Sequence, residues 1–151
     1  MSVGAGGAAH AANLSARARV LGVAERVRFV PVVTDVGPWY AAADVMLVPS
    51  REDSFPSVGR EAMSHGLPVV ASDGATGMGE LLRRGPGVLV PAGDTGAMAA
   101  AVMELPDDPA ARARMGAVGR RIIAAEHGWD AYVGFVLALA LPGNRSITSG
   151  R

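Results

Sequence analysis

The sequence predicts an α/β fold in which a parallel sheet is covered by helices on both faces. Short runs of β-branched and other apolar residues alternate along the 151-residue chain with longer stretches rich in Ala and Arg, which is typical of strands and helices in turn. The apolar runs are nearly continuous, as expected of strands that are buried on both faces. Hydrophobic residues make up 50% of the chain, which is enough for one core of ordinary domain size.

Turn-forming and capping residues mark where the helices begin and end. Gly22, Gly66 and Gly85 each follow a helical stretch as a C-cap. Asp94 and Asp108 each precede one as an N-cap. In chain order, the expected elements are a helix at 10–21, a strand at 27–33, a helix at 38–43, a strand at 45–49, a helix at 56–65, a strand at 68–72, a helix at 77–84, a strand at 88–91, and helices at 95–104, 109–126 and 129–141.

The last apolar run, residues 131–142, is expected to form a buried helix. It has twelve residues and is interrupted by Gly134, whereas a helix that spans a bilayer needs about 20. The first ten residues have neither the basic segment nor the apolar core of a signal peptide, so a cytoplasmic protein is expected. The polar residues after Pro142 are expected to be frayed.

Charge and cysteine content exclude several classes of function. The 14 basic residues, all Arg, balance 14 acidic ones, so the chain has no basic arm for nucleic acid. There is no Cys, which excludes a disulfide, a thiolate zinc site and a cysteine nucleophile. His10, His65 and His127 are scattered without ligand spacing, so no metal site is expected.

Residues 50–72 carry the pattern that is most informative about function. A strand ends there, a loop with acidic residues follows, and Pro56 lies at the first turn of the next helix. Ligands of open α/β sheets bind outside the carboxyl ends of strands, and a helix N-terminus attracts phosphate. Asp53 and Glu61, with seven residues between them, could each accept hydrogen bonds from vicinal hydroxyls. Phosphate and diol together predict a nucleotide-sugar site, although both acids could instead stabilise the helix end.

The same segment resembles the nucleotide-sugar-binding half of retaining, glycogen-synthase-like glycosyltransferases of group 1, which have the GT-B fold. Their E-x7-E motif corresponds to Asp53-x7-Glu61, within R-E-D-S-F-P-S-V-G-R-E-A-M-S-H-G-L-P-V-V-A-S. Three further blocks follow the family's order and spacing: R-V-R-F-V, Y-A-A-A-D-V-M-L-V-P-S and G-V-L-V-P-A-G-D. The resemblance covers residues 3–129. It implies a Rossmann-like domain, the C-terminal half of a GT-B fold, that lacks its first strand and helix.

The resemblance also implies a role for each residue that matches the family's motifs. Glu61 would hold the ribose hydroxyls and Asp53 a hydroxyl of the transferred sugar, and we expect both to be the catalytic residues. Asp53 stands where the family usually has Glu. The resemblance further implies that the small residue Gly4 lies near the acceptor or phosphates and that the backbone of Phe29 and Val30 contacts the base. The N–H groups of Ser54, Phe55, Ser57 and Val58 would face the sugar and diphosphate. Pro56 belongs to the same expected binding segment but has no N–H to donate.

By the same resemblance, the chain is expected to be the donor-binding half of a hexosyltransferase-type enzyme that is inactive in isolation. The expected organisation is a donor-binding domain at residues 1–128, a crossover helix at 129–142 and a flexible tail at 143–151. An acceptor-binding N-terminal domain would be the missing partner. Any peripheral membrane association is expected only through that half. No cofactor or metal is expected, since the nucleotide-diphosphate sugar is a substrate.

Two alternatives to the enzyme remain at the level of sequence. Gly4-x-Gly6-x-x-Ala9, with Glu25 about 20 residues on, satisfies a relaxed dinucleotide fingerprint, but the strand before it has only three residues. A chain that has lost the enzyme's other half could also be a non-catalytic binding or interaction module. Self-association through the last helix without nucleotide binding would favour this second alternative.

Overall fold

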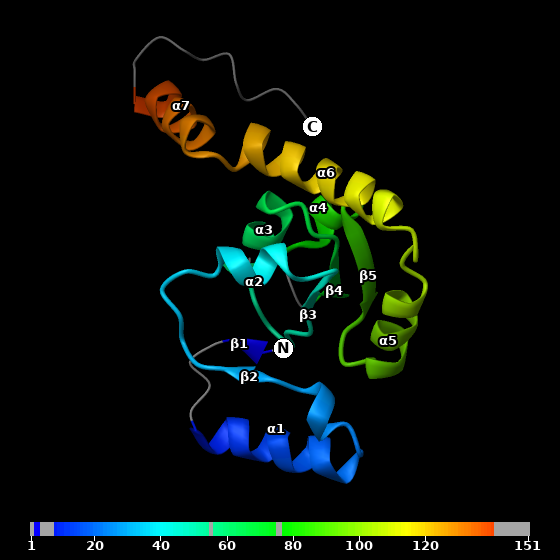
Figure 1. Cartoon of the computed structure of the whole chain (residues 1–151). Helices are drawn as coiled ribbons and strands as arrows, with labels where there is room; N and C mark the ends of the chain where they lie inside the picture. The colour runs from blue at the N-terminus through cyan, green and yellow to red at the C-terminus, as the bar shows by residue number, and fades with distance from the viewer. Residues whose placement is uncertain (1, 4–7, 55, 75–76, 141–151) are drawn as a thin grey trace. The chain divides into compact units, whose positions relative to one another are not determined.

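The computed structural model describes residues 2–3, 8–54, 56–74 and 77–140, and the chain divides into two compact units, residues 1–38 and 39–151 (Figure 1). The first unit contains β1 (Ser2–Val3), α1 (Ala8–Val20), the 3-10 turn η1 (Ala24–Arg26) and β2 (Phe29–Val30). The second contains β3 (Met46–Val48), α3 (Ser57–Ser64), β4 (Val69–Asp73), α4 (Gly79–Leu82), β5 (Gly87–Pro91), α5 (Thr95–Met103), α6 (Pro109–Glu126) and α7 (Trp129–Ala140), while α2 (Gly37–Ala41) begins at the end of the first unit.

In the first unit, β1 and β2 form a parallel pair, with Ser2 opposite Phe29 and Val3 opposite Val30. The strand predicted over residues 27–33 is therefore reduced to two residues. Pro31 follows directly and has no N–H to donate to a ladder, and Val32 is exposed. The helix before it ends as predicted, because Gly22 adopts a φ of 67°, a conformation that favours glycine.

In the second unit, three parallel strands lie in the order β3-β4-β5. Side chains of β4 alternate between two apolar clusters, as the pleat of a strand requires. Val69 and Ala71 join the cluster under α3, α4 and α6, while Val70 joins the cluster under α5. Both faces of β4 are thus covered, which confirms the parallel sheet flanked by helices.

Helix α6 approaches α3 and the turn after it closely because glycines line one of its faces. A Cβ atom on Gly116 would overlap the carbonyl oxygen of Gly66, and one on Gly119 would lie 3.3 Å from the Cβ of Met63. Ile122, on the same face, is buried.

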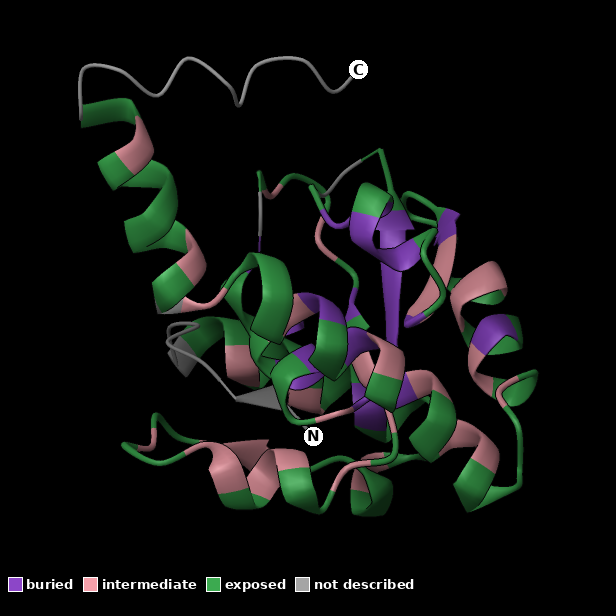
Figure 2. Cartoon of the chain, turned by 90° about the horizontal axis from the view of Figure 1, so that it is seen from above, coloured by how far each residue is buried: buried purple, intermediate pink, exposed green. Residues whose placement is uncertain are grey.

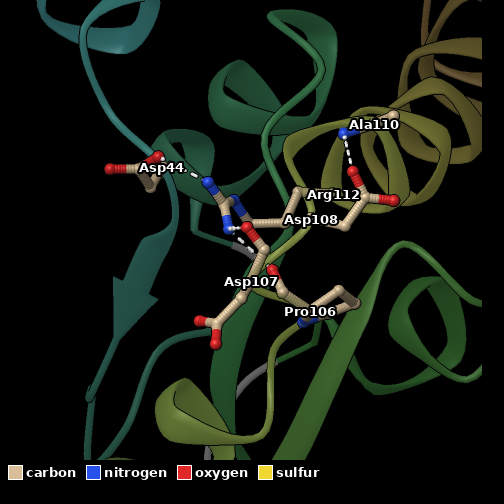
Figure 3. Close-up of polar contacts among 6 residues, drawn as sticks. All are labelled: Asp44, Pro106, Asp107, Asp108, Ala110 and Arg112. Carbon is tan, nitrogen blue, oxygen red and sulfur yellow. Dashed lines mark hydrogen bonds and ion pairs between the residues drawn. The ribbon is translucent and has the colours of Figure 1, made fainter.

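Both predicted N-caps are confirmed, and Arg112 is held in place beside one of them. Asp94 accepts a hydrogen bond from the Ala97 N–H at 2.8 Å, and Asp108 accepts one from Ala110 at 2.9 Å. Arg112 donates to the carbonyls of residues 106 and 107 at 2.6 and 3.0 Å and pairs with Asp44 at 3.2 Å (Figure 3). The arginine therefore links the start of α6 to the residues before β3.

Helix α7 is exposed along most of its length, so the prediction of a buried helix is wrong (Figure 2). Phe135 is 58% exposed and Leu139 70% exposed. Met103 is likewise 82% exposed at the end of α5, whereas Met98 packs against the cluster under α5. Apolar periodicity indicates which residues can be buried, but another surface must be present to bury them.

Residues 109–140 are long and apolar enough, by length and composition alone, to cross a membrane. One such stretch is weak evidence for a span. It consists of two helices, because His127 has a non-helical backbone at the end of α6 (φ −124°, ψ 10°). With 12 residues, α7 alone is about 18 Å long, shorter than a hydrocarbon core of roughly 30 Å.

Candidate functional site

The candidate site begins where β3 ends. Residues 49–56 lead from that strand to α3, whose N-cap is Pro56 with an extended backbone (φ −60°, ψ 119°). The sequence predicts Pro56 in the first turn of the helix, whereas in the structure Pro56 precedes the helix. The N-cap residue, Pro56, makes no side-chain hydrogen bond to this N-terminus. Ser57 and Val58 are exposed there, and a helix start is suited to an anion.

Asp53 lies in this loop and is half-buried. Its carbonyl oxygen accepts a hydrogen bond from the Gly77 N–H at 3.2 Å. That bond ties the loop after β3 to the segment between β4 and α4. The backbone on which the Asp53 carboxylate is carried is therefore fixed at the edge of the sheet where ligands of this fold class bind.

Glu61 lies on α3, and its exposed carboxylate contacts a tyrosine from another helix. The Tyr40 hydroxyl, on α2, donates a hydrogen bond to Glu61 Oε2 at 3.1 Å, and it lies 3.5 Å from the carbonyl oxygen of Val58. Burial, and then the adjacent Glu61 charge and hydrogen bond, raise the pKa of Tyr40 to about 12. The phenol is therefore protonated at neutral pH and is available as a donor.

The Tyr40 ring is also fixed by stacking. It lies on the His65 ring with centroids 5.0 Å apart and planes 22° apart, and it packs against the core cluster under α3. His65 is the C-cap of α3, and its carbonyl oxygen accepts a hydrogen bond from Arg120 at 3.0 Å. Tyr40 therefore packs against the core, and its contacts with Glu61 and His65 were not predicted from the sequence.

A signal for the missed contacts exists in the sequence. Glu61 and His65 are four residues apart and so lie on one face of a helix. A partly buried Tyr normally finds a partner for its hydroxyl. What the sequence does not show is that Tyr40, 21 residues before Glu61, faces that side of α3.

A second polar group lies at the carboxyl end of β4. Arg83 donates to both carboxylate oxygens of Asp73, at 2.9 and 3.1 Å, and the Gly74 N–H donates to Oδ1 at 3.0 Å. Asp73 and Gly74 line a pocket together with residues 89–91 at the end of β5. The Arg83 side chain is exposed and paired with Asp73. Its charge offsets that of the Asp73 carboxylate.

The structure places some predicted site residues in the second unit and others elsewhere. Asp53, Ser54 and Glu61 lie within the connection between β3 and α3 or on α3 itself. Phe29 and Val30 form β2 in the first unit and are half-buried. The predicted contacts at Gly4 and Phe55 lie outside the described residues. Within the described residues, no group of three His, Asp or Glu side chains is arranged to hold a metal ion.

The chain is similar in sequence to glycosyltransferases of actinobacteria. It is 39% identical over 130 residues to the D-inositol 3-phosphate glycosyltransferase of Thermomonospora curvata, a match that covers 84% of this chain and 30% of that protein. It is 40% identical over 139 residues to the enzyme of the same name from Kineococcus radiotolerans, covering 83% of this chain and 31% of that protein. The chain thus spans about a third of the length of these relatives.

Two solved structures share its fold. Sucrose-phosphate synthase from Thermosynechococcus elongatus superimposes with a TM-score of 0.82 at 30% identity, over 91% of this chain and 36% of that one. The Anabaena protein HepE, solved in complex with UDP, superimposes with a TM-score of 0.74 at 27% identity, over 86% of this chain and 36% of that one. Residues 1–108 match the family model "Glycosyl transferases group 1". With its parallel sheet and helical layers, the chain belongs to the group 1 glycosyltransferases and has the Rossmann-like architecture of their GT-B fold.

Proposed function

We propose that the chain is the donor-binding half of a retaining glycosyltransferase, which transfers a sugar from a nucleotide-diphosphate sugar to an acceptor. One observation carries the proposal. The connection after β3 combines a helix N-terminus, at which the N-cap Pro56 makes no side-chain hydrogen bond, with an exposed carboxylate, Glu61, held in a hydrogen bond. A helix N-terminus is suited to bind phosphate, and a carboxylate is suited to accept hydrogen bonds from the ribose hydroxyls. The UDP complex of the similar protein HepE supports a nucleoside diphosphate as ligand.

Each group of the site has a task in this proposal. The Glu61 carboxylate accepts hydrogen bonds from the ribose hydroxyls, and Asp53 accepts one from a hydroxyl of the sugar. The N–H groups of Ser57 and Val58 face the diphosphate. As the bond between the anomeric carbon and the diphosphate breaks, negative charge grows on the leaving oxygen, and fixed N–H dipoles stabilise it. The oxygen of the acceptor hydroxyl bonds to the anomeric carbon on the face that the diphosphate leaves, and its proton passes to the departing diphosphate oxygen.

The proposal includes what the site needs from outside this chain. Side chains of an acceptor-binding domain would complete the cleft and supply the cationic part of the phosphate site, since the chain covers only 30% of the length of a relative such as the Thermomonospora curvata enzyme. Donor binding needs no metal ion or cofactor. The enzyme would act in the cytoplasm, and any peripheral membrane association would come from the acceptor-binding half.

Calorimetric titration of the chain with UDP, GDP and ADP tests the proposal. We expect one of the three to bind, equally well with and without a chelator, and Glu61→Ala to abolish that binding. Glu104→Ala, which removes an exposed carboxylate at the C-terminal end of α5, is the matched control and should bind as the wild type does. If none of the three nucleotides binds, the proposal is wrong for this chain. Self-association without binding would then favour the interaction module.

A further inference from the structure

Tyr40 makes contacts that its packing role does not require. Its hydroxyl donates to Glu61 Oε2 at 3.1 Å while its ring lies on His65. A hydroxyl at a partly exposed position could be hydrated instead. Here it is directed at the carboxylate that the proposed function places on the ribose.

A glutamate on an exposed helix face has several side-chain torsions and no fixed direction. To accept hydrogen bonds from two neighbouring hydroxyls, its carboxylate must present a defined edge. One hydrogen bond from a fixed donor to Oε2 restricts these torsions. It leaves Oε1 and the second lone pair of Oε2 to accept from a ligand.

Tyr40 is a suitable donor because the tyrosine is itself held in place. The ring is packed between the core cluster under α3 and the His65 ring. The backbone of His65 is in turn tied to α6 through the 3.0 Å hydrogen bond from Arg120. The hydroxyl therefore has a fixed position relative to α3, which carries Glu61.

We propose that Tyr40 is a positioning residue that holds the Glu61 carboxylate in the orientation that accepts both hydroxyls of a ribonucleoside diphosphate. The inference rests on the proposed function, because it assumes that Glu61 binds the ribose. It adds a residue of α2, outside the Asp53-x7-Glu61 motif, to the determinants of ribose recognition.

The test compares UDP with 2′-deoxy-UDP, which lacks one of the two hydroxyls. Binding of each ligand to the full chain is measured by NMR titration, which detects weak affinities. For the wild type we expect UDP to bind more tightly. Tyr40→Phe keeps the ring and its stacking but removes the donor, and it should weaken UDP binding by up to about tenfold, the usual range for one hydrogen bond. It should change 2′-deoxy-UDP binding much less, so the preference for UDP shrinks.

Two further variants complete the experiment. Glu61→Gln should remove most of the preference for UDP, and Tyr40→Phe added to it should cause no further loss, because the two residues act through one carboxylate. Tyr132→Phe, at the exposed tyrosine of α7, is the matched control and should leave both affinities unchanged.

The outcomes separate this inference from the proposed function. If Glu61→Gln reduces the preference for UDP and Tyr40→Phe does not, the role of Tyr40 is overturned and the proposed function stands. Equal loss of both ligands in Tyr40→Phe, with a lower melting temperature, would show a structural role only and would also overturn the inference. If Glu61→Gln leaves the preference unchanged, or the wild type binds neither ligand, the proposed ribose role of Glu61 fails, and the inference fails with it.

Discussion

The role of a single residue at the candidate site depends on its contacts as much as on its residue type. Asp53 and Glu61 are both acidic and belong to one motif, yet they lie in different surroundings. The Asp53 backbone is tied to Gly77, whereas the Glu61 side chain accepts a hydrogen bond from Tyr40. The spacing of the motif predicts two carboxylates near one site. It contains no information about the donor that orients one of them.

The pKa of Tyr40 leads to a prediction about stability at high pH. Folding raises this pKa from the ordinary 10.0 to about 12, so the unfolded chain loses the proton first. The contribution of the protonated phenol is fully present below pH 10 and is lost as the pH rises to about 12. The free energy of unfolding should therefore fall more steeply over this range in the wild type than in Tyr40→Phe. Urea denaturation at a series of pH values measures the slopes, and parallel slopes would contradict the prediction.

At the scale of elements, the predictions that rest on local chemistry agree best with the structure. Helix α6 spans Pro109–Glu126, the predicted bounds, because an aspartate cap and a proline define its start. The strand predicted at 27–33 is much shorter, since Pro31 interrupts its hydrogen bonding. Neighbouring residues determine where a helix begins, whereas the length of a strand depends on a partner strand.

The close approach of α6 to the turn after α3 predicts a strong effect of adding one methyl group. In Gly116→Ala the new Cβ would overlap the backbone of Gly66, which cannot move aside as a flexible side chain could. We expect a loss of about 1 to 3 kcal/mol in the free energy of unfolding, measured by chemical denaturation.

Gly134→Ala in α7 is the matched control, because a Cβ there has nothing within 4 Å. The same substitution should leave stability unchanged or raise it by up to about 1 kcal/mol, since Ala favours a helix over Gly. Equal effects of the two substitutions would show that the helices are not in such close contact in solution.

At the scale of the whole molecule, the β3-β4-β5 sheet is covered by apolar clusters, whereas α7 has little cover. Apolar side chains of α7, among them Phe135 and Leu139, are exposed. The chain also spans only about 30% of the length of the relatives it matches. Both observations agree with the proposal that the site is completed by a further domain.

We therefore predict that the isolated chain binds a nucleoside diphosphate but transfers no sugar. The groups proposed to bind the donor lie on this chain, whereas acceptor binding and the cationic part of the phosphate site are proposed to lie elsewhere. Incubation with UDP-sugars and a panel of acceptors, followed by mass spectrometry of the products, measures transfer. A full-length relative such as the Thermomonospora curvata enzyme serves as the positive control. Robust transfer by the chain alone would contradict the prediction.

The sequence by itself determined the fold class, the order of the elements, the helix caps and the family, because each depends on residues that are close together in the chain. Hydrophobic runs, capping residues and the Asp53-x7-Glu61 spacing are all local patterns. The tertiary structure alone decided that Tyr40 reaches Glu61, that Gly116 lies against Gly66, and that α7 remains exposed. Those contacts join segments that are distant in the sequence, and they form only where packing brings two surfaces together.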